Sequence, residues 1–387
     1  MDFAFTKEQQ EFRQEVIDFC KQELGARERP ADFAEAFRRK IAQRGWTGLS
    51  IPKEYGGLGL GAIYRVIFME EMAYWRAPIV PYDYGVTMSL LGKICLRHGS
   101  EEQKREYLPR IARGEIFCGQ GYSEPQAGND LSAIQTRAVR QGERYIVNGQ
   151  KMWVHDARTY QYTLLMVRTD PNAPPEKGIS LLILDNSSPG VTVVPQLAMS
   201  GQLTPQVFLD NVEVPVRNLL GEENRGWDYY LENKPFYWNK EQGAETGTMR
   251  RLFDDLVRYV SQTTRDGRPL KQHPMVRQKL ARVATDIRAV RFLMYRMAWM
   301  EDQGLDLFNI AAIARVFHVE AWVRSASTAM QILGLAGQLG LGEEHAPLRG
   351  ITEAWYRQAA LQLMQRAGPS YVKSTIATHL LGLPEAW

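Results

Sequence analysis

Cysteine is scarce in this chain, whose 387 residues include only Cys20, Cys95 and Cys118. An odd number of widely spaced cysteines argues against a disulfide framework, and the spacing lacks the close pairs of a zinc knuckle or a redox motif. We therefore expect three reduced thiols that pack in the protein interior, where free cysteine is usually found.

Long apolar runs are also missing. No stretch approaches the roughly 18 apolar residues that a membrane-spanning helix needs. The first residues, MDFAFTKEQQEF, begin acidic and lack the basic and then apolar layout of a signal peptide. These absences predict a cytoplasmic protein with no membrane partner.

Charge of one sign is lacking as well. The chain has 47 Lys and Arg against 44 Asp and Glu, a formal net charge of +3, and these residues are scattered without a polybasic block. A surface that binds nucleic acid needs clustered positive charge to follow a phosphate backbone. The sequence therefore predicts no nucleic-acid partner.

The composition that is present, 44% apolar and 24% charged, is that of a globular protein, and the chain is longer than the roughly 100 to 200 residues of one domain. We expect residues 1–118 to be helical. Thr6 and Gln9 form a capping box, and apolar residues recur behind it at helical spacing. Gly and Pro residues in the stretch Gly45–Gly59 predict a loop between two of the helices.

Residues 119–225 are predicted to form a β-domain, because short apolar or alternating runs are separated by Gly, Pro and Asn. Within it, Asn148-Gly149 is a turn dipeptide and predicts a hairpin between Arg144–Val147 and Lys151–Val154. Residues 226–387 return to helical periodicity and are expected to pack as an antiparallel bundle, with apolar stripes at Ile287, Val290, Met294 and Met297 and at Ile313, Val316, Phe317 and Ala321. The order helix, strand, helix predicts an α+β fold and disfavours a doubly wound nucleotide fold.

Six motifs in order resemble the acyl-CoA dehydrogenase family. The segment GYSEPQAGNDL at Gly121–Leu131, followed by NGQKMW at Asn148–Trp153, is similar to the family signature in residues and in spacing. The supporting matches are Gly45–Leu60, Gly99–Pro109, Val212–Glu222 and Leu380–Pro384. The resemblance therefore spans essentially the whole chain.

The resemblance implies a helical N-terminal domain, a β middle domain and a C-terminal four-helix bundle that mediates dimer and tetramer formation. It also implies an FAD cofactor between the β-domain and the bundle, with a neighbouring subunit contacting the adenosine end. An acyl-CoA would be the substrate, and an electron-transferring flavoprotein would accept the electrons.

Several site residues are carried over from the family motif. Gln120, Tyr122 and Ser123 would lie along the flavin, where fixed donors tune its electronics. Gly128 and Asn129 would allow close approach of the backbone to the cofactor or to CoA.

Trp153 would stack on the flavin. His155 falls where the family commonly has a threonine that hydrogen-bonds the ring. For each of these residues the alternative is ordinary: a turn, a core tryptophan or a satisfied histidine.

At the adenosine end, Gln331 and Gly334 lie in a segment that resembles the one meeting the pyrophosphate across the subunit interface. The family arginine is expected at Thr263, so Arg265 is the nearest guanidinium that could reach phosphate oxygens. A plain surface arginine is the alternative.

The catalytic base is the main departure from the family. The dehydrogenation needs a carboxylate that takes the α-proton while hydride leaves for the flavin. The two positions at which the family keeps this glutamate correspond here to Arg366 and Tyr237. Glu241, one turn beyond Tyr237 along the same helix, is the best remaining carboxylate, and the alternative is a solvated helix residue.

Four hypotheses stay open on the sequence. The chain is an active acyl-CoA dehydrogenase with a displaced base, or a non-catalytic partner in a heteromeric dehydrogenase of the type that degrades steroid side chains. It is otherwise a flavin-dependent monooxygenase or desulfinase on the same fold, or a purely structural helical module, which poorly explains the retained signature. The resemblance leaves open a homo-tetramer or a hetero-tetramer with a related subunit.

Overall fold

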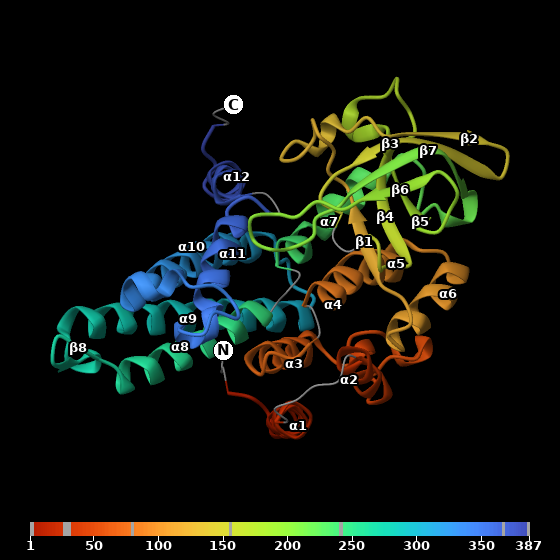
Figure 1. The fold of residues 1–387 in the computed structure, drawn as a ribbon. Helices are drawn as coiled ribbons and strands as arrows, with labels where there is room; N and C mark the ends of the chain where they lie inside the picture. The colour runs from red at the N-terminus through yellow and green to blue at the C-terminus, as the bar shows by residue number, and fades with distance from the viewer. Residues whose placement is uncertain are drawn as a thin grey trace.

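The computed structural model describes residues 4–25, 32–78, 81–154, 157–239, 243–365 and 368–384. A helical block, a β-domain and a second helical block follow one another along the chain (Figure 1). The predicted α+β class, with a β middle domain between a helical N-terminal domain and a C-terminal helical bundle, is confirmed.

The described residues of the first block form helices and turns. Thr6 and Gln9 make the expected capping box at the start of the first helix, and Ser100 with Gln103 makes a second one further along. Two 3-10 turns, Trp46–Gly48 and Lys53–Tyr55, occupy the predicted loop. The helices are α1 (Lys7–Leu24), α2 (Phe33–Gln43), α3 (Ala62–Tyr74), α4 (Pro81–Thr87), a π-helical turn Met88–Gly92, α5 (Lys93–His98) and α6 (Glu101–Ala112).

The middle domain is built on one twisted sheet. Its strands are β1 (Cys118–Gly121), β2 (Arg137–Gln141), β3 (Arg144–Lys151), β4 (Tyr162–Arg168), β5 (Ile179–Asp185), β6 (Val191–Val194) and β7 (Gln206–Pro215). The strand order is β1-β4-β2-β3-β7-β6, with β5 paired to β4. Both faces of β4 and β5 are buried, which is why these two strands have continuous rather than alternating apolar sequences.

The predicted hairpin turn at Asn148-Gly149 is wrong. Both residues lie inside β3, at a register shift against β7, where Asn148 Oδ1 accepts from the backbone N–H of Asn211 at 2.8 Å. The turn that joins β2 to β3 contains Gly142 instead, whose φ of 58° suits glycine. An Asn-Gly pair favours both turns and bulges, and long-range pairing with β7 selects the bulge.

The second helical block consists of α7 (Gly226–Trp238), α8 (Ala244–Gln262), a small β8–β9 hairpin (Thr264–Arg265 and Arg268–Pro269), α9 (Pro274–Asp302), α10 (Phe308–Leu333), α11 (Ile351–Gln362) and α12 (Pro369–Thr375). The α9 stripe is buried as predicted. The predicted α10 stripe fits less well: Ala321 is buried, Val316 and Phe317 are half-buried, and 39% of Ile313 is exposed.

A buried charge cluster joins the two helical blocks. Glu70 on α3 is 1% exposed and accepts from Arg250 of α8 at 2.7 Å, from Arg291 of α9 at 2.8 Å and from the Tyr295 hydroxyl. Burial opposes ionisation of Glu70, but the attraction of Arg291 and Arg250 outweighs it and lowers the pKa of this carboxyl. The helices of the first block therefore pack on the bundle through ion pairs as well as apolar contacts.

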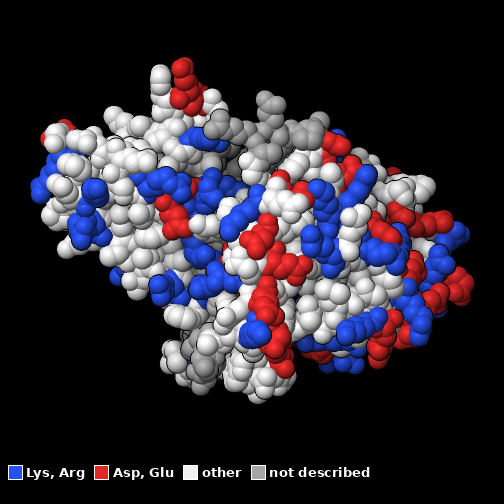
Figure 2. All heavy atoms as spheres, turned by 90° about the horizontal axis from the view of Figure 1, so that it is seen from below, with Lys and Arg blue, Asp and Glu red and all other residues white. Residues whose placement is uncertain are grey.

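The surface and the thiols follow the sequence expectations. Cys20, Cys95 and Cys118 are free and buried. Acidic and basic side chains are interleaved on the face drawn in Figure 2. Within the described ranges, the helices fall short of the length and apolar character needed to cross a bilayer.

Candidate active site

The loop after β1 is fixed by a buried lysine. Lys151 Nζ lies 2.7 Å from Glu124 Oε1 and also donates to the carbonyls of Tyr122 at 3.1 Å and Met166 at 2.6 Å. The Glu124 carboxylate accepts two backbone N–H groups as well, from Gln135 at 2.7 Å and Thr136 at 2.9 Å. These contacts hold the chain that carries the signature segment in one conformation against β3 and β4.

Burial shifts the pKa values of Lys151 and Glu124 in opposite directions. Burial lowers the pKa of Lys151 to about 8, although Glu124 favours its charged form. Burial would raise the Glu124 pKa, but the Lys151 ammonium and the hydrogen bonds lower it below its usual value. Glu124 is therefore an ionised structural carboxylate rather than a free base.

Trp153 is held out of the core in a strained backbone conformation. Its φ is 55°, in the left-handed region, and the residue is 50% exposed. The next residue, Val154, is fixed by an N–H donated to the Pro205 carbonyl at 3.0 Å. Such strain costs about 1 to 3 kcal/mol and is typical of functional positions. An indole face presented in this way suits a flat ligand ring.

The other residues predicted along the flavin lie around this tryptophan and β1. Gly128 is beside the indole, since a Cβ there would lie 4.0 Å from Trp153 Cζ3. Ser123 accepts the Met152 N–H at its carbonyl, Gln120 is half-buried on β1, and Asn129 is exposed. The structure thus brings Ser123, Gly128 and Trp153 into one region.

A row of tyrosines and a lysine covers the inner face of α7. The Tyr122 ring centroid lies 6.0 Å from that of Tyr230 and 6.5 Å from that of Tyr237. Lys234, 6% exposed, donates to the Tyr371 hydroxyl at 3.2 Å and lies 5.9 Å from the Tyr230 ring centroid. This face therefore presents phenols and an ammonium group rather than a carboxylate.

The protonation state of these phenols follows from their burial. Tyr122 and Tyr230 are 1% and 7% exposed, and burial raises the pKa of each far above its usual range. The Tyr122 hydroxyl has no hydrogen-bond partner among the described residues. Neutral phenols can donate a hydrogen bond to a ligand but cannot take its proton.

The catalytic carboxylate predicted from sequence cannot be placed. Glu241, together with His155 and Arg366, lies outside the described residues. The argument that Glu241 shares a helix face with Tyr237 is wrong, because α7 ends at Trp238 and α8 begins at Ala244. The helix stops soon after Pro235, and Asn239 leaves the helical conformation.

Gln331, Gly334 and Arg265 meet at the far end of the bundle. Arg265 Nη2 donates to the Ile332 carbonyl at 2.9 Å, at the end of α10, and Gly334 terminates that helix with a φ of 68°. Gln331 Oε1 accepts from Lys279 Nζ at 2.6 Å. A surface hollow joins Arg265, Lys279 and Gln331 to Arg268 and His273. Its basic lining is suited to a diphosphate.

The Trp153 region fits the ring end of an FAD molecule, and the basic hollow fits the pyrophosphate end. The two regions of one chain lie too far apart to bind the same FAD molecule. The half-exposed indole and the unpartnered Tyr122 hydroxyl match a flat ring with hydrogen-bonding edges, and the basic hollow matches a pyrophosphate. Figure 1 shows the β8–β9 hairpin at the end of the bundle remote from the β-domain. One flavin would therefore take its ring contacts from one chain and its pyrophosphate contacts from another.

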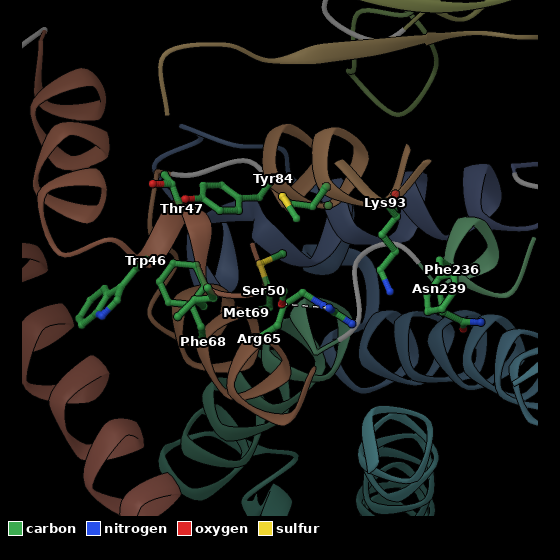
Figure 3. Close-up of a pocket in the computed structure, with 14 residues that line it drawn as sticks. Trp46, Thr47, Ser50, Arg65, Phe68, Met69, Tyr84, Lys93, Phe236 and Asn239 are labelled. Carbon is green, nitrogen blue, oxygen red and sulfur yellow. Dashed lines mark hydrogen bonds between the residues drawn. The ribbon is translucent and has the colours of Figure 1, made fainter. Parts of the chain in front are cut away.

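A separate narrow cavity of about 30 Å³ lies between the first block and α7. Figure 3 shows its mainly apolar walls with Arg65 of α3 and Lys93 of α5 directed into it. Both cations pair with Glu301 of α9, and Arg65 Nη2 is 2.7 Å from that carboxylate. We call this space the Lys93 cavity.

Sequence reasoning missed both Lys151 and Lys93 as site-forming residues. Lys151 had a usable signal: strand alternation places it on the same side of β3 as the buried Tyr145 and Val147, where a lysine needs an acidic partner. Lys93 had none, because its partner Glu301 is 208 residues away in the chain.

Comparison with known proteins agrees with this geometry. Models of the N-terminal, middle and C-terminal domains of acyl-CoA dehydrogenases match residues 6–115, 119–212 and 224–372. The acyl-CoA dehydrogenase FadE26 of Mycobacterium tuberculosis is 34% identical over 408 aligned residues, covering 100% of both proteins. Two solved structures also cover 100% of both chains: the Tcur3481-Tcur3483 steroid ACAD, 29% identical with a TM-score of 0.89, and the ChsE4-ChsE5 complex of Mycobacterium tuberculosis, 32% identical with a TM-score of 0.88.

Proposed function

Because this chain belongs to the acyl-CoA dehydrogenase family, we propose that it takes part in the α,β-dehydrogenation of an acyl-CoA thioester as one subunit of an assembly with a related chain. In this assembly the related chain carries the base that removes the α-proton. FAD is the cofactor, and an electron-transferring flavoprotein takes the electrons onward. Three buried free thiols support a reducing compartment, and we place the assembly in the cytoplasm.

The observation that carries the proposal is the packing of the α7 face. The position where the family keeps a glutamate is occupied by Tyr237, which packs beside Tyr122 and Tyr230. Lys234, one turn earlier, adds a positive charge. A positive charge disfavours the protonation of a neighbouring amine, so such an amine would be a poor base. Buried phenols stay protonated and, like an ammonium group, donate hydrogen bonds rather than accept a proton, so this face is suited to hold a ligand but not to deprotonate it.

We assign the contacts to FAD by chemistry. FAD, when bound, supplies the acceptor for the hydride that leaves the β-carbon. Trp153 would support the ring, Tyr122 and Ser123 would donate to its edge, and Lys279 and Gln331 would receive the pyrophosphate end of a second flavin. Because the two sets lie at opposite ends of the chain, a second subunit has to complete each site. The two-component composition of the ChsE4-ChsE5 complex supports a heteromeric arrangement.

The test is the absorbance spectrum of the chain alone and of the chain mixed with a related subunit, before and after acyl-CoA is added. We expect flavin absorbance in the mixture, bleaching by acyl-CoA only in the mixture, and no effect of Glu241→Gln on that bleaching. Bleaching by the chain alone, reduced about 10² to 10⁴-fold by Glu241→Gln while FAD stays bound, would establish the catalytic alternative instead. A colourless mixture that cannot be reconstituted with FAD would overturn both.

A further inference from the structure

Lys93 is a buried cation that has to share its counter-ion. Its side chain is 13% exposed, and Glu301 is the only carboxylate within ion-pair distance of it among the described residues. The same carboxylate also binds Arg65. On the other side, the Lys93 ammonium lies 3.3 Å from the centroid of the Phe236 ring, and Arg97 lies 5.1 Å from the same centroid. Among the described residues, the wall around Lys93 therefore holds more positive than negative charge.

The titration of Lys93 agrees with this imbalance. Burial lowers its pKa to about 7, Glu301 opposes that shift, and the positive charges of Arg65 and Arg97 add to it. Glu301 behaves in the opposite way, because two cations outweigh its burial and lower its pKa to about 2. An additional anion beside Lys93 would thus stabilise the charged form of the lysine, whereas Glu301 already has two cationic partners.

The rest of the cavity is mostly apolar, although Thr47, Ser89 and Asn239 also line it. Its walls include Trp46, Leu49, Phe68, Met69, Met88 and Phe236. The hydroxyl of Ser50 is engaged by Arg65 Nη1 at 3.2 Å, and the Tyr84 hydroxyl is buried without a partner among the described residues. Apolar walls with a cation at one side select a ligand that is aliphatic along its length and anionic at its tip.

The available space limits the ligand to a few heavy atoms. A volume of about 30 Å³ corresponds to two or three water molecules, since each needs roughly 10 to 15 Å³ by this measure. A carboxylate group with the carbon that carries it is of this size, so only the tip of a longer aliphatic chain would enter the cavity, and a ring system is too large.

We propose that the Lys93 cavity binds the carboxylate end of a short aliphatic chain, with Lys93 as the residue that receives the charge. Two sources have this chemistry: a free short-chain carboxylic acid, and the distal carboxylate of an acyl group attached to CoA. The second source fits the position of the cavity, because Phe236 in its wall precedes Tyr237 of the α7 face. Binding of a free acid does not depend on the function proposed above, whereas binding of the distal end of an acyl-CoA rests on that function.

The experiment is calorimetric titration of the purified protein, with its flavin and any partner subunit, at about pH 7. Pentanoate and 1-pentanol form one matched pair of probes, and adipyl-CoA and hexanoyl-CoA form another, since the members of each pair differ in the terminal carboxylate. We expect at least about tenfold tighter binding of the carboxylate member of one or both pairs. A preference with pentanoate alone identifies a free-acid site, and a preference with adipyl-CoA identifies the acyl end.

Variants connect the preference to Lys93. Lys93→Met should abolish it, and Lys7→Met, at a lysine whose side chain is 85% exposed, should leave it unchanged. Glu301→Gln removes the competing carboxylate, so pentanoate should raise the melting temperature of this variant more than that of the wild type, even if the variant is destabilised. Equal binding of both members in both pairs, or a preference that persists in Lys93→Met, overturns the proposal. The flavin spectrum is recorded separately, so a failure of this site is distinguishable from a failure of the proposed function.

Discussion

Lys151 and Glu124 form an ion pair with Nζ and Oε1 2.7 Å apart, and their side chains are only 0% and 3% exposed. Lys151→Met should lower the free energy of unfolding by about 3 to 5 kcal/mol, because it leaves the Glu124 carboxylate buried without its counter-charge. Urea denaturation measures this loss. The double variant Lys151→Met with Glu124→Gln should recover part of it, and a double variant no more stable than the single one would contradict the argument.

Substitution of Trp153 should affect FAD binding much more than it affects the stability of the fold. Because it is 50% exposed, Trp153→Ala should change the unfolding free energy by less than about 1 kcal/mol, while the affinity of the reconstituted assembly for FAD should fall at least about tenfold. Trp238→Ala is the matched control: this residue is fully buried, so its truncation should cost about 3 to 5 kcal/mol. If both variants lose stability equally and keep FAD, Trp153 is a core residue.

The Lys93 ammonium should make stability depend on pH in the neutral to alkaline range. Its pKa of about 7 in the folded protein lies below the ordinary 10.5, so between these values the unfolded chain holds more protons than the folded one. Stability contributed by this group therefore rises as the pH increases through that window. Relative to Lys93→Met, the wild type should gain about 1 to 2 kcal/mol between roughly pH 7 and pH 9, measured by urea denaturation. A difference that stays flat or falls over this range would rule out a depressed pKa, and Lys7→Met provides the exposed control.

The basic hollow at the end of the bundle should matter for the cofactor rather than for folding. Lys279→Met and Gln331→Ala each remove one partner of a hydrogen bond near the surface, so the unfolding free energy should change by less than about 1 kcal/mol. The affinity of the assembly for FAD should nevertheless fall by about tenfold, which titration of the apoprotein with FAD measures. Lys271→Met, at an exposed lysine outside this hollow, should leave the affinity unchanged. Similar losses in all three variants would indicate a general charge effect.

Local sequence patterns predicted most of the fold, because the elements concerned depend on neighbours in the chain. The Thr6 capping box and the strand Ile179–Leu184 are encoded by a few adjacent residues. The failure at Asn148-Gly149 is instructive in the same terms. This dipeptide is locally compatible with two backbone shapes, and only the pairing of β3 with β7, some 60 residues later, decides between them.

The candidate site was predictable only where the chemistry lies within a motif. Ser123, Gly128 and Trp153 come together because they lie in the two signature segments that follow β1 and β3, which the Met152 N–H joins by donating to the Ser123 carbonyl. The position of the catalytic base was not predictable, because the prediction required a helix that continues past Trp238, and α7 stops there. The Lys93 cavity was also invisible, since residues from three distant helices form its charged wall.

The Glu70 cluster has a consequence for how the protein can be divided. Sequence motifs suggest a boundary near residue 118, yet the carboxylate of Glu70 finds its counter-charges, Arg250 and Arg291, only in the second helical block. A fragment that ends at that boundary would expose one side of α3 and leave a buried acid without a partner. We therefore expect the two helical blocks to unfold together rather than as separate domains, with the β-domain interrupting them in the chain.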